Sequence, residues 1–95
     1  MEEKDFLNVE IRMIQKFGYG VALMYAALQK RRKEVYPGDE YLDTSIWFSL
    51  SLEEVEHETG LSYYKQEKAC KVLCDNDYID CKIKGMPARR SFVIF

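Results

Sequence analysis

Residues 51–74 read SLEEVEHETGLSYYKQEKACKVLC, and this segment says more about the fold than any other in the chain. Ser51 followed three residues later by Glu54 has the spacing of a capping box. In this motif the serine hydroxyl accepts a hydrogen bond from the third helical amide, and the glutamate side chain accepts one from the serine amide. Gly60 suits the left-handed residue at a helix end, and Ser62 suits the cap of the next helix. The segment therefore predicts two helices joined by a tight turn, a helix-turn-helix over about 51–74.

The second of these helices, over Tyr63–Cys74, has two different faces. Gln66, Ala69 and Leu73 recur at spacings of three and four and are expected to point inward. The residues expected to point outward are Tyr63, Tyr64, Lys65, Glu67, Lys68 and Lys71. The outward face has two interpretations: it meets phosphates and base edges of DNA, or it is an ordinary solvated helix surface.

Residues 78–95 predict a two-stranded hairpin, the wing of a winged helix. Apolar residues alternate with polar ones over Tyr78–Lys84, Gly85–Ala88 turns the chain, and Arg89–Phe95 returns as the second strand. The alternation places on the inner side Ile79, Cys81 and Ile83. The outward positions are expected to be basic: Lys82, Lys84, Arg89 and Arg90. These cations suit contact with phosphates or a minor groove, and they equally suit an edge strand that uses charge to prevent aggregation.

Upstream of residue 51, the clearest element is a helix over Val21–Lys33, whose apolar residues recur at spacings of three and four. It ends in four successive cations, which the helix dipole favours at a C-terminus. Gly18-Tyr19-Gly20 predicts a turn before it. Phe6–Phe17 is apolar and is expected to begin extended and to turn helical near Glu10, with its type left open. Glu34–Asp43 predicts a loop.

The order of these elements predicts the fold class. A short strand near 46–49, rich in β-branched and aromatic residues, precedes the helix-turn-helix. The expected class is α+β, with three to four helices and a small antiparallel sheet made of the short strand and the C-terminal hairpin. We therefore expect one winged helix-turn-helix domain over 1–95, with its wing over about 78–95.

Composition and charge bound the classes of function. A chain of 95 residues, 47% hydrophobic and 32% charged, builds one modest core and has no room for a separate catalytic domain. The formal net charge is -2, but residues 1–60 carry a balance of -5 and residues 61–95 a balance of +3. The C-terminal third of the chain is therefore basic, and a DNA-binding protein needs a local basic patch of this kind. No apolar run is long enough for a membrane span and the N-terminus is too acidic for a signal peptide, so we expect a cytoplasmic, nucleoid-associated protein without a membrane partner.

Neither a metal site nor a catalytic site is expected. Cys70, Cys74 and Cys81 lack the Cys-x-x-Cys spacing of structural zinc, and His57 is the single histidine. We expect three reduced thiols, with Cys70 and Cys81 in the core. His57 lies among glutamates without a nucleophile beside it, and Gly18-Tyr19-Gly20 lacks the further glycines and the lysine of a phosphate-binding loop. The sequence therefore predicts no enzyme activity, no metal and no cofactor.

A set of short runs in the C-terminal half carries a resemblance: Trp47-Phe48, Ser51–Val55, Thr59–Ser62, Lys68-Ala69, Leu73, Tyr78-Ile79 and Lys84–Pro87. They resemble the winged-helix domains of phage and plasmid replication initiators and replisome organisers. Phe6–Val9 and Ala22–Leu28 are similar to the first elements of those domains, so the resemblance covers nearly the whole chain. One departure is Tyr63-Tyr64 at the start of the recognition helix, where short polar or basic residues are commoner. The resemblance implies a winged-helix fold that binds double-stranded DNA in phage or plasmid replication.

Two hypotheses on function follow. The first is a DNA-binding module of phage or plasmid replication, with a homodimer through residues 6–33 and a replication protein as further partners. The second is a protein-interaction module, or a small transcriptional regulator, on the same fold. The residues expected to contact duplex DNA are Ser62, Tyr63, Tyr64, Lys65, Lys68, Lys71, Lys82, Lys84, Arg89 and Arg90.

Overall fold

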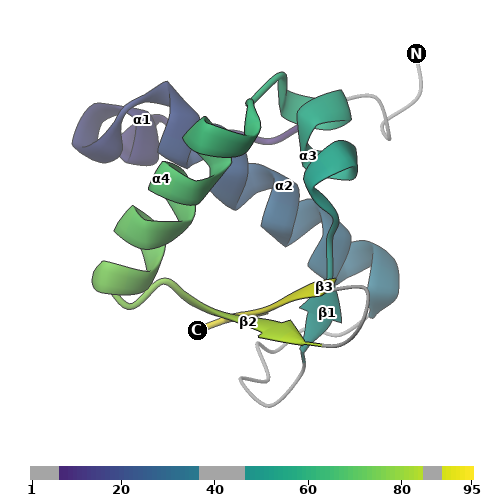
Figure 1. Cartoon of the computed structure of the whole chain (residues 1–95). Coiled ribbons are helices and arrows are strands. Elements are labelled where there is room, and N and C mark those ends of the chain that lie inside the picture. Colours follow the sequence, from purple (N-terminus) through teal and green to yellow (C-terminus); the bar gives the residue numbers. More distant parts are fainter. Residues whose placement is uncertain (1–6, 37–46, 85–88) are drawn as a thin grey trace.

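The structure, a computed structural model, describes residues 7–36, 47–84 and 89–95, with Lys84 described by its backbone alone. Within this part of the chain the helices are α1 (Ile11–Phe17), α2 (Tyr19–Val35), α3 (Leu52–Thr59) and α4 (Tyr63–Asp75) (Figure 1). The strands are β1 (Phe48–Ser49), β2 (Ile79–Lys84) and β3 (Arg89–Ile94). The predicted α+β class is confirmed, with an arrangement consistent with a winged helix.

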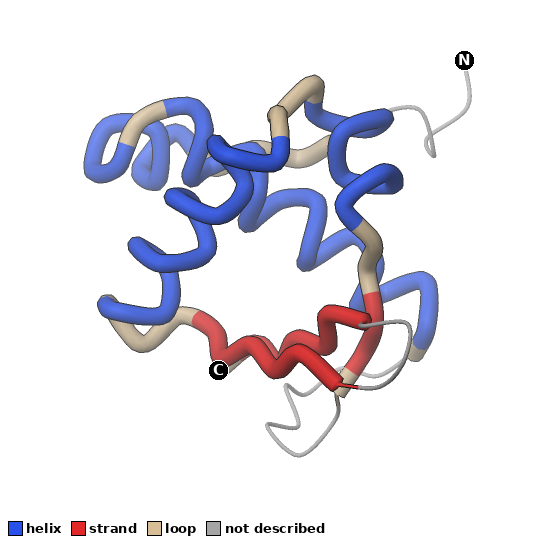
Figure 2. The backbone as a smooth tube through the Cα atoms, in the orientation of Figure 1, coloured by secondary structure: helices blue, strands red, loops and turns tan. Residues whose placement is uncertain are grey.

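The strands form a small antiparallel sheet in which β3 lies between β1 and β2. Figure 2 shows the sheet at one end of the molecule, with the helices grouped beyond it and α4 leading directly into β2. The predicted short strand therefore pairs with the C-terminal hairpin, as expected. The predicted turn at Gly85–Ala88 and loop residues 37–43 lie outside the described residues, whereas Glu34 and Val35, predicted as the start of that loop, belong to α2.

Local signals in the sequence place the ends of α3 and α4. The Ser51 hydroxyl accepts from the Glu54 amide at 3.1 Å, and the Ser62 hydroxyl accepts from the Lys65 amide at 3.3 Å. Gly60 ends α3 with a φ of 77°, a left-handed conformation that costs glycine little. The Glu54 carboxylate forms an ion pair with Arg31 of α2, so this side chain ties α3 to its neighbouring helix.

The predicted turn at Gly18-Tyr19-Gly20 is too long. Gly18 alone interrupts the chain, with a φ of 90°, and α2 already begins at Tyr19. Gly20 lies in the first turn of α2, where its helical conformation costs only about 1 kcal/mol relative to alanine. The change from extended to helical chain near Glu10 is confirmed, because Glu10 is the N-cap of α1.

The core fills the space between α2, α4 and the inner face of the sheet. Leu28, Leu73 and Phe92, one from each of these elements, are fully buried. Tyr78, at the base of the wing, packs edge-on against two rings, with centroid distances of 5.8 Å to Phe17 and 5.5 Å to Tyr25. These pairs attach the wing to α1 and α2 and each stabilise the fold by about 0.5–1.5 kcal/mol beyond the buried area. No helix in the described ranges is long and apolar enough to cross a membrane.

The register of the hairpin corrects the predicted orientation of Arg90. Ile79 pairs with Ile94, Cys81 with Phe92 and Ile83 with Arg90, so these six residues share the inner face of the sheet. Arg89 and Arg90 are adjacent on one strand and therefore point to opposite faces. Only Arg89 points outward, and the prediction that Arg90 does so is wrong. Ile83 lies on the inner face as predicted, but it is 69% exposed because it lies beyond the core.

Candidate functional site

The outward face of α4 matches the prediction from helical spacing. Gln66, Ala69 and Leu73 are buried, at 1%, 2% and 0% exposure. The exposed row of α4 comprises Tyr63, Tyr64, Lys65, Glu67, Lys68 and Lys71. One continuous helix face therefore presents two tyrosines, three lysines and a single carboxylate to solvent.

Contacts within the exposed row order its first two turns. The Lys68 ammonium lies over the Tyr64 ring, 4.8 Å from the ring centroid. A hydrogen bond from the Tyr63 hydroxyl to Glu67 raises the pKa of that tyrosine. The Ser62 hydroxyl is committed to the Lys65 amide, so its role in the structure is to cap α4. Both tyrosine rings remain largely exposed, at 56% and 63%.

Gln66 connects three separate segments beneath this row. Its amide nitrogen Nε2 donates to the Leu52 carbonyl and to the Leu61 carbonyl, each at 3.0 Å. Its oxygen Oε1 accepts from Arg90 Nη2 at 2.9 Å. The partners fix the amide orientation, because two carbonyls require the donor end and a guanidinium requires the acceptor end. One buried amide thus binds the start of α3, the turn before α4 and the wing.

Arg90 occupies the space between the wing and α4. Its guanidinium lies 5.3 Å from the Phe92 ring centroid, and burial lowers its pKa. Within the described residues its Nε atom is buried and has no hydrogen-bond partner. Arg90 is therefore the structural link between β3 and Gln66. Sequence reasoning missed this link, although strict alternation from buried Phe92 would have placed Arg90 inward.

The remaining cations of the wing lie on the outer face of the sheet. Lys82 and Arg89 are exposed, and the Lys82 ammonium lies over the Trp47 ring at 4.0 Å from its centroid. The backbone of Lys84 pairs with Arg89, which places residue 84 on the same face. The predicted site is therefore divided into a lysine and tyrosine row on α4 and a cationic outer face of the wing, with Arg90 between them.

The acidic side chains of α3 are partly neutralised by the cations that end α2. Glu54 pairs with Arg31, and the carboxylate of Glu58 lies 3.3 Å from the Lys30 ammonium. By contrast, Lys65, Lys68 and Lys71 have no ion pair within the described part of the chain. The basic character of α4 is therefore left available to a ligand, whereas much of the acidic character of α3 is used within the fold.

The three thiols pack around this inner region. Cys70, Cys74 and Cys81 are each partly buried and pack against the core, whereas Cys70 and Cys81 were expected within it. Burial raises the pKa of all three thiols, that of Cys70 to about 12. Among the described residues, no group of three or more His, Cys, Asp or Glu side chains is placed to hold a metal ion.

Comparison with known proteins gives one likeness of fold. No family model matches the sequence, and no curated protein matches it. The chain is similar in structure to an N-terminal domain of a DNA-binding protein, with a TM-score of 0.64 and 16% sequence identity. The likeness covers 95% of this chain and 73% of that chain. At such low identity it shows that the two share a fold.

Proposed function

We propose that this chain is a DNA-binding module that places the exposed row of α4 in the major groove of duplex DNA. The observation that carries the proposal is the exposed row itself, in which Lys65, Lys68 and Lys71 have no ion pair among the described residues. A helix of 13 residues is about 20 Å long, which suits a recognition helix. The similar fold, described as a domain of a DNA-binding protein, supports the same assignment.

The first turn of α4 has the chemistry for base and phosphate contacts. Residues near the N-terminus of a recognition helix contact base edges, and here these are Tyr63, Tyr64 and Lys65. A lysine donates to the O6 and N7 acceptors of guanine, and a tyrosine hydroxyl donates to phosphate oxygens. Ser62 is the N-cap of α4, so the first backbone amides of the helix and the positive end of its dipole lie at this point. Both favour binding of a phosphate group.

In this proposal the wing contacts flanking phosphates through its outer face. Lys82 and Arg89 are the exposed cations of that face, and Lys84 shares it by register. Arg90 is removed from the proposed contacts, because its guanidinium is bonded to Gln66. The wing therefore supplies affinity for the DNA backbone, whereas α4 supplies sequence preference.

The proposed biological setting is phage or plasmid replication, with transcriptional control as the alternative on the same fold. The resemblance to replication initiators supports it. A homodimer through residues 6–33 is part of the proposal, and large apolar side chains in that segment favour it: Ile11 is 70% exposed and Tyr19 71%. In this proposal the chain binds its partners and catalyses no reaction. The proposed partners are duplex DNA, a second copy of the chain and a replication protein.

A salt titration tests the proposal. The chain is titrated into fluorescently labelled duplex at several salt concentrations, and binding is followed by anisotropy. The logarithm of the affinity is expected to fall with the logarithm of salt at a slope of about -0.9 for each phosphate neutralised. Lys65→Ala with Lys71→Ala should reduce affinity for duplex, whereas Lys33→Ala, which changes an exposed lysine at the end of α2, should not.

Two outcomes would count against the proposal. If the parent chain binds no duplex at low salt, the protein-interaction hypothesis replaces it. If the double alanine variant binds duplex as well as the Lys33 variant does, then α4 is not the face that meets DNA.

A further inference from the structure

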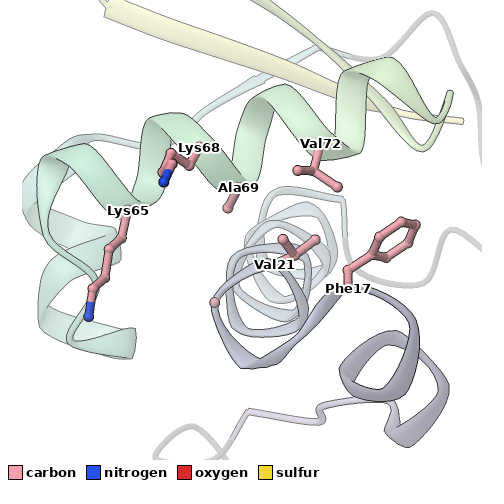
Figure 3. Close-up of a pocket in the computed structure, with 7 residues that line it drawn as sticks. Phe17, Val21, Lys65, Lys68, Ala69 and Val72 are labelled. Carbon is pink, nitrogen blue, oxygen red and sulfur yellow. The ribbon is translucent and has the colours of Figure 1, made fainter.

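A shallow apolar groove of about 190 Å³ separates α4 from the junction of α1 and α2. Figure 3 shows it, and its lining residues are Phe17, Gly20, Val21, Lys65, Lys68, Ala69 and Val72. No carboxylate is among these residues. Its lining is therefore largely apolar, and the charged residues among those that line it are Lys65 and Lys68, with the Lys68 ammonium over the Tyr64 ring.

The groove has a cationic end and an apolar end. In Figure 3, Lys65 and Lys68 lie toward one end, while Phe17 and Val72 lie toward the other. Along α4, Lys65 and Val72 are seven positions apart, a rise of about 10 Å. On a second helix lying alongside, positions i and i+7 are also two turns and about 10 Å apart. Two side chains at that spacing therefore match the two ends of the groove.

We infer that this groove binds an acidic amphipathic helix of a partner protein. A large apolar side chain of the partner packs against Phe17 and Val72, and its carboxylates, one to two turns away, meet Lys65 and Lys68. Charge complementarity favours this occupant, since two of the described residues that line the groove are lysines and none of them is acidic. The groove runs along α4, so a helix lying beside α4 places its i, i+4 and i+7 side chains in it.

Gly20 keeps the middle of the groove open. It is in helical conformation, and a Cβ added there would meet only the Leu61 Cδ2 atom, at 3.8 Å, an ordinary van der Waals contact. An alanine at position 20 is therefore compatible with the fold, and a larger side chain there is designed to fill the groove that Gly20 lines. Gly20→Leu is the blocking variant, and it changes no residue proposed to contact DNA.

The binding test uses the full chain, isotopically labelled with ¹⁵N, and synthetic peptides. The probes are 16-residue helical peptides with a Leu or Phe anchor and Glu residues one and two turns away, placed in both directions along the helix. Amide shifts are expected at residues 17–21 and 65–72. Replacing the glutamates with glutamine, or the anchor with serine, should weaken binding about tenfold, since either loss removes on the order of one anchoring interaction.

Variants of the chain locate the peptide. Gly20→Leu is expected to weaken the peptide about tenfold, and Lys65→Ala with Lys68→Ala to weaken it similarly. Lys71→Ala serves as the matched control on α4, because Lys71 does not line the groove. Thermal unfolding confirms that each variant folds. If no peptide shifts the groove amides at millimolar concentration, or if Gly20→Leu binds peptide as the parent does, the inference is wrong.

The groove shares Lys65 and Lys68 with the proposed DNA-binding face, and its residues Phe17, Gly20 and Val21 fall within the segment 6–33 proposed for the homodimer. Where the chain binds duplex, the peptide should displace it, because one pair of ammonium groups cannot serve both ligands. Gly20→Leu should weaken peptide binding about tenfold and leave duplex binding unchanged, whereas Lys71→Ala should weaken duplex binding and leave peptide binding unchanged. If the chain binds peptide in the groove but binds no duplex, the proposed function is wrong and the inference about the groove stands. If duplex stays bound at saturating peptide, the two ligands do not share Lys65 and Lys68.

Discussion

Replacing Gln66 with methionine is expected to lower the free energy of unfolding by about 3 kcal/mol. Methionine has a similar length and helix propensity, so the change removes polar groups without leaving a large cavity. Three hydrogen bonds are lost, two to the carbonyls of Leu52 and Leu61 and one from Arg90. Each bond contributes about 1 kcal/mol net, and the bond to a guanidinium somewhat more.

Urea denaturation followed by circular dichroism measures this loss. For a domain of this size, about 3 kcal/mol lowers the melting temperature by roughly 12–24 °C. Gln15→Met is the matched control, since Gln15 is exposed on α1 and the same substitution there should change stability by less than about 0.5 kcal/mol. A loss below about 1 kcal/mol at position 66 would contradict the prediction, because the three bonds together would then contribute less than one ordinary hydrogen bond.

A double-mutant cycle separates the contribution of Arg90. Gln66→Met, Arg90→Met and the double variant are expected to give a coupling energy between about 0.5 and 3 kcal/mol, the range for residues joined in one network. Additive losses would show that Gln66 stabilises the fold only through its two carbonyl partners. The cycle therefore tests whether the wing and α4 are energetically coupled.

Three further predictions concern the caps, the thiols and the assembly. Ser51→Ala should cost about 1 kcal/mol in urea denaturation by removing the cap of α3, whereas exposed Ser49→Ala should cost less, and equal losses would contradict this. Burial raises the pKa of the Cys70 thiol from 9.0 to about 12, so iodoacetamide at pH 8 should label the folded chain more slowly than the unfolded chain, and equal labelling rates would exclude the buried site. The free energy of unfolding should also fall as the pH rises from 9 to about 12, because the thiol ionises first in the unfolded chain. Light scattering at high micromolar concentration should give a dimeric mass that Tyr19→Asp abolishes, and a monomeric parent would contradict the interface through residues 6–33.

The elements that sequence reasoning placed correctly depend on local rules. Ser51, Gly60 and Ser62 mark the ends of α3 and α4 because a cap or a left-handed residue acts within three or four positions of the chain. The faces of α4 follow in the same way from helical spacing, which put Gln66 on the buried side. What remained hidden is why a polar residue occupies a buried position.

The partners of Gln66 explain why the site was only partly predictable. They lie 14, 5 and 24 residues away in the sequence, so no local pattern connects them. Arg90 was predicted outward because two adjacent cations look like one basic patch, whereas a strand sends neighbouring side chains to opposite faces. Gly20 was assigned to a turn because glycine weakens a helix, but packing of α2 outweighs that small cost.

The inward position of Arg90 changes how the wing acts. A half-buried guanidinium costs desolvation energy, and the hydrogen bond to Gln66 and the Phe92 ring offset part of it. In return, β3 is held at a fixed position relative to α4, the helix that carries the exposed lysines. A DNA-binding domain whose wing and recognition helix are already fixed relative to each other loses less conformational entropy when it binds DNA. More of its contact energy therefore remains as binding free energy. If the chain binds duplex as proposed, loss of the Gln66–Arg90 bond should weaken that binding in the folded protein, although neither residue is among the proposed DNA contacts. The salt slope should stay unchanged, because no proposed phosphate contact is removed.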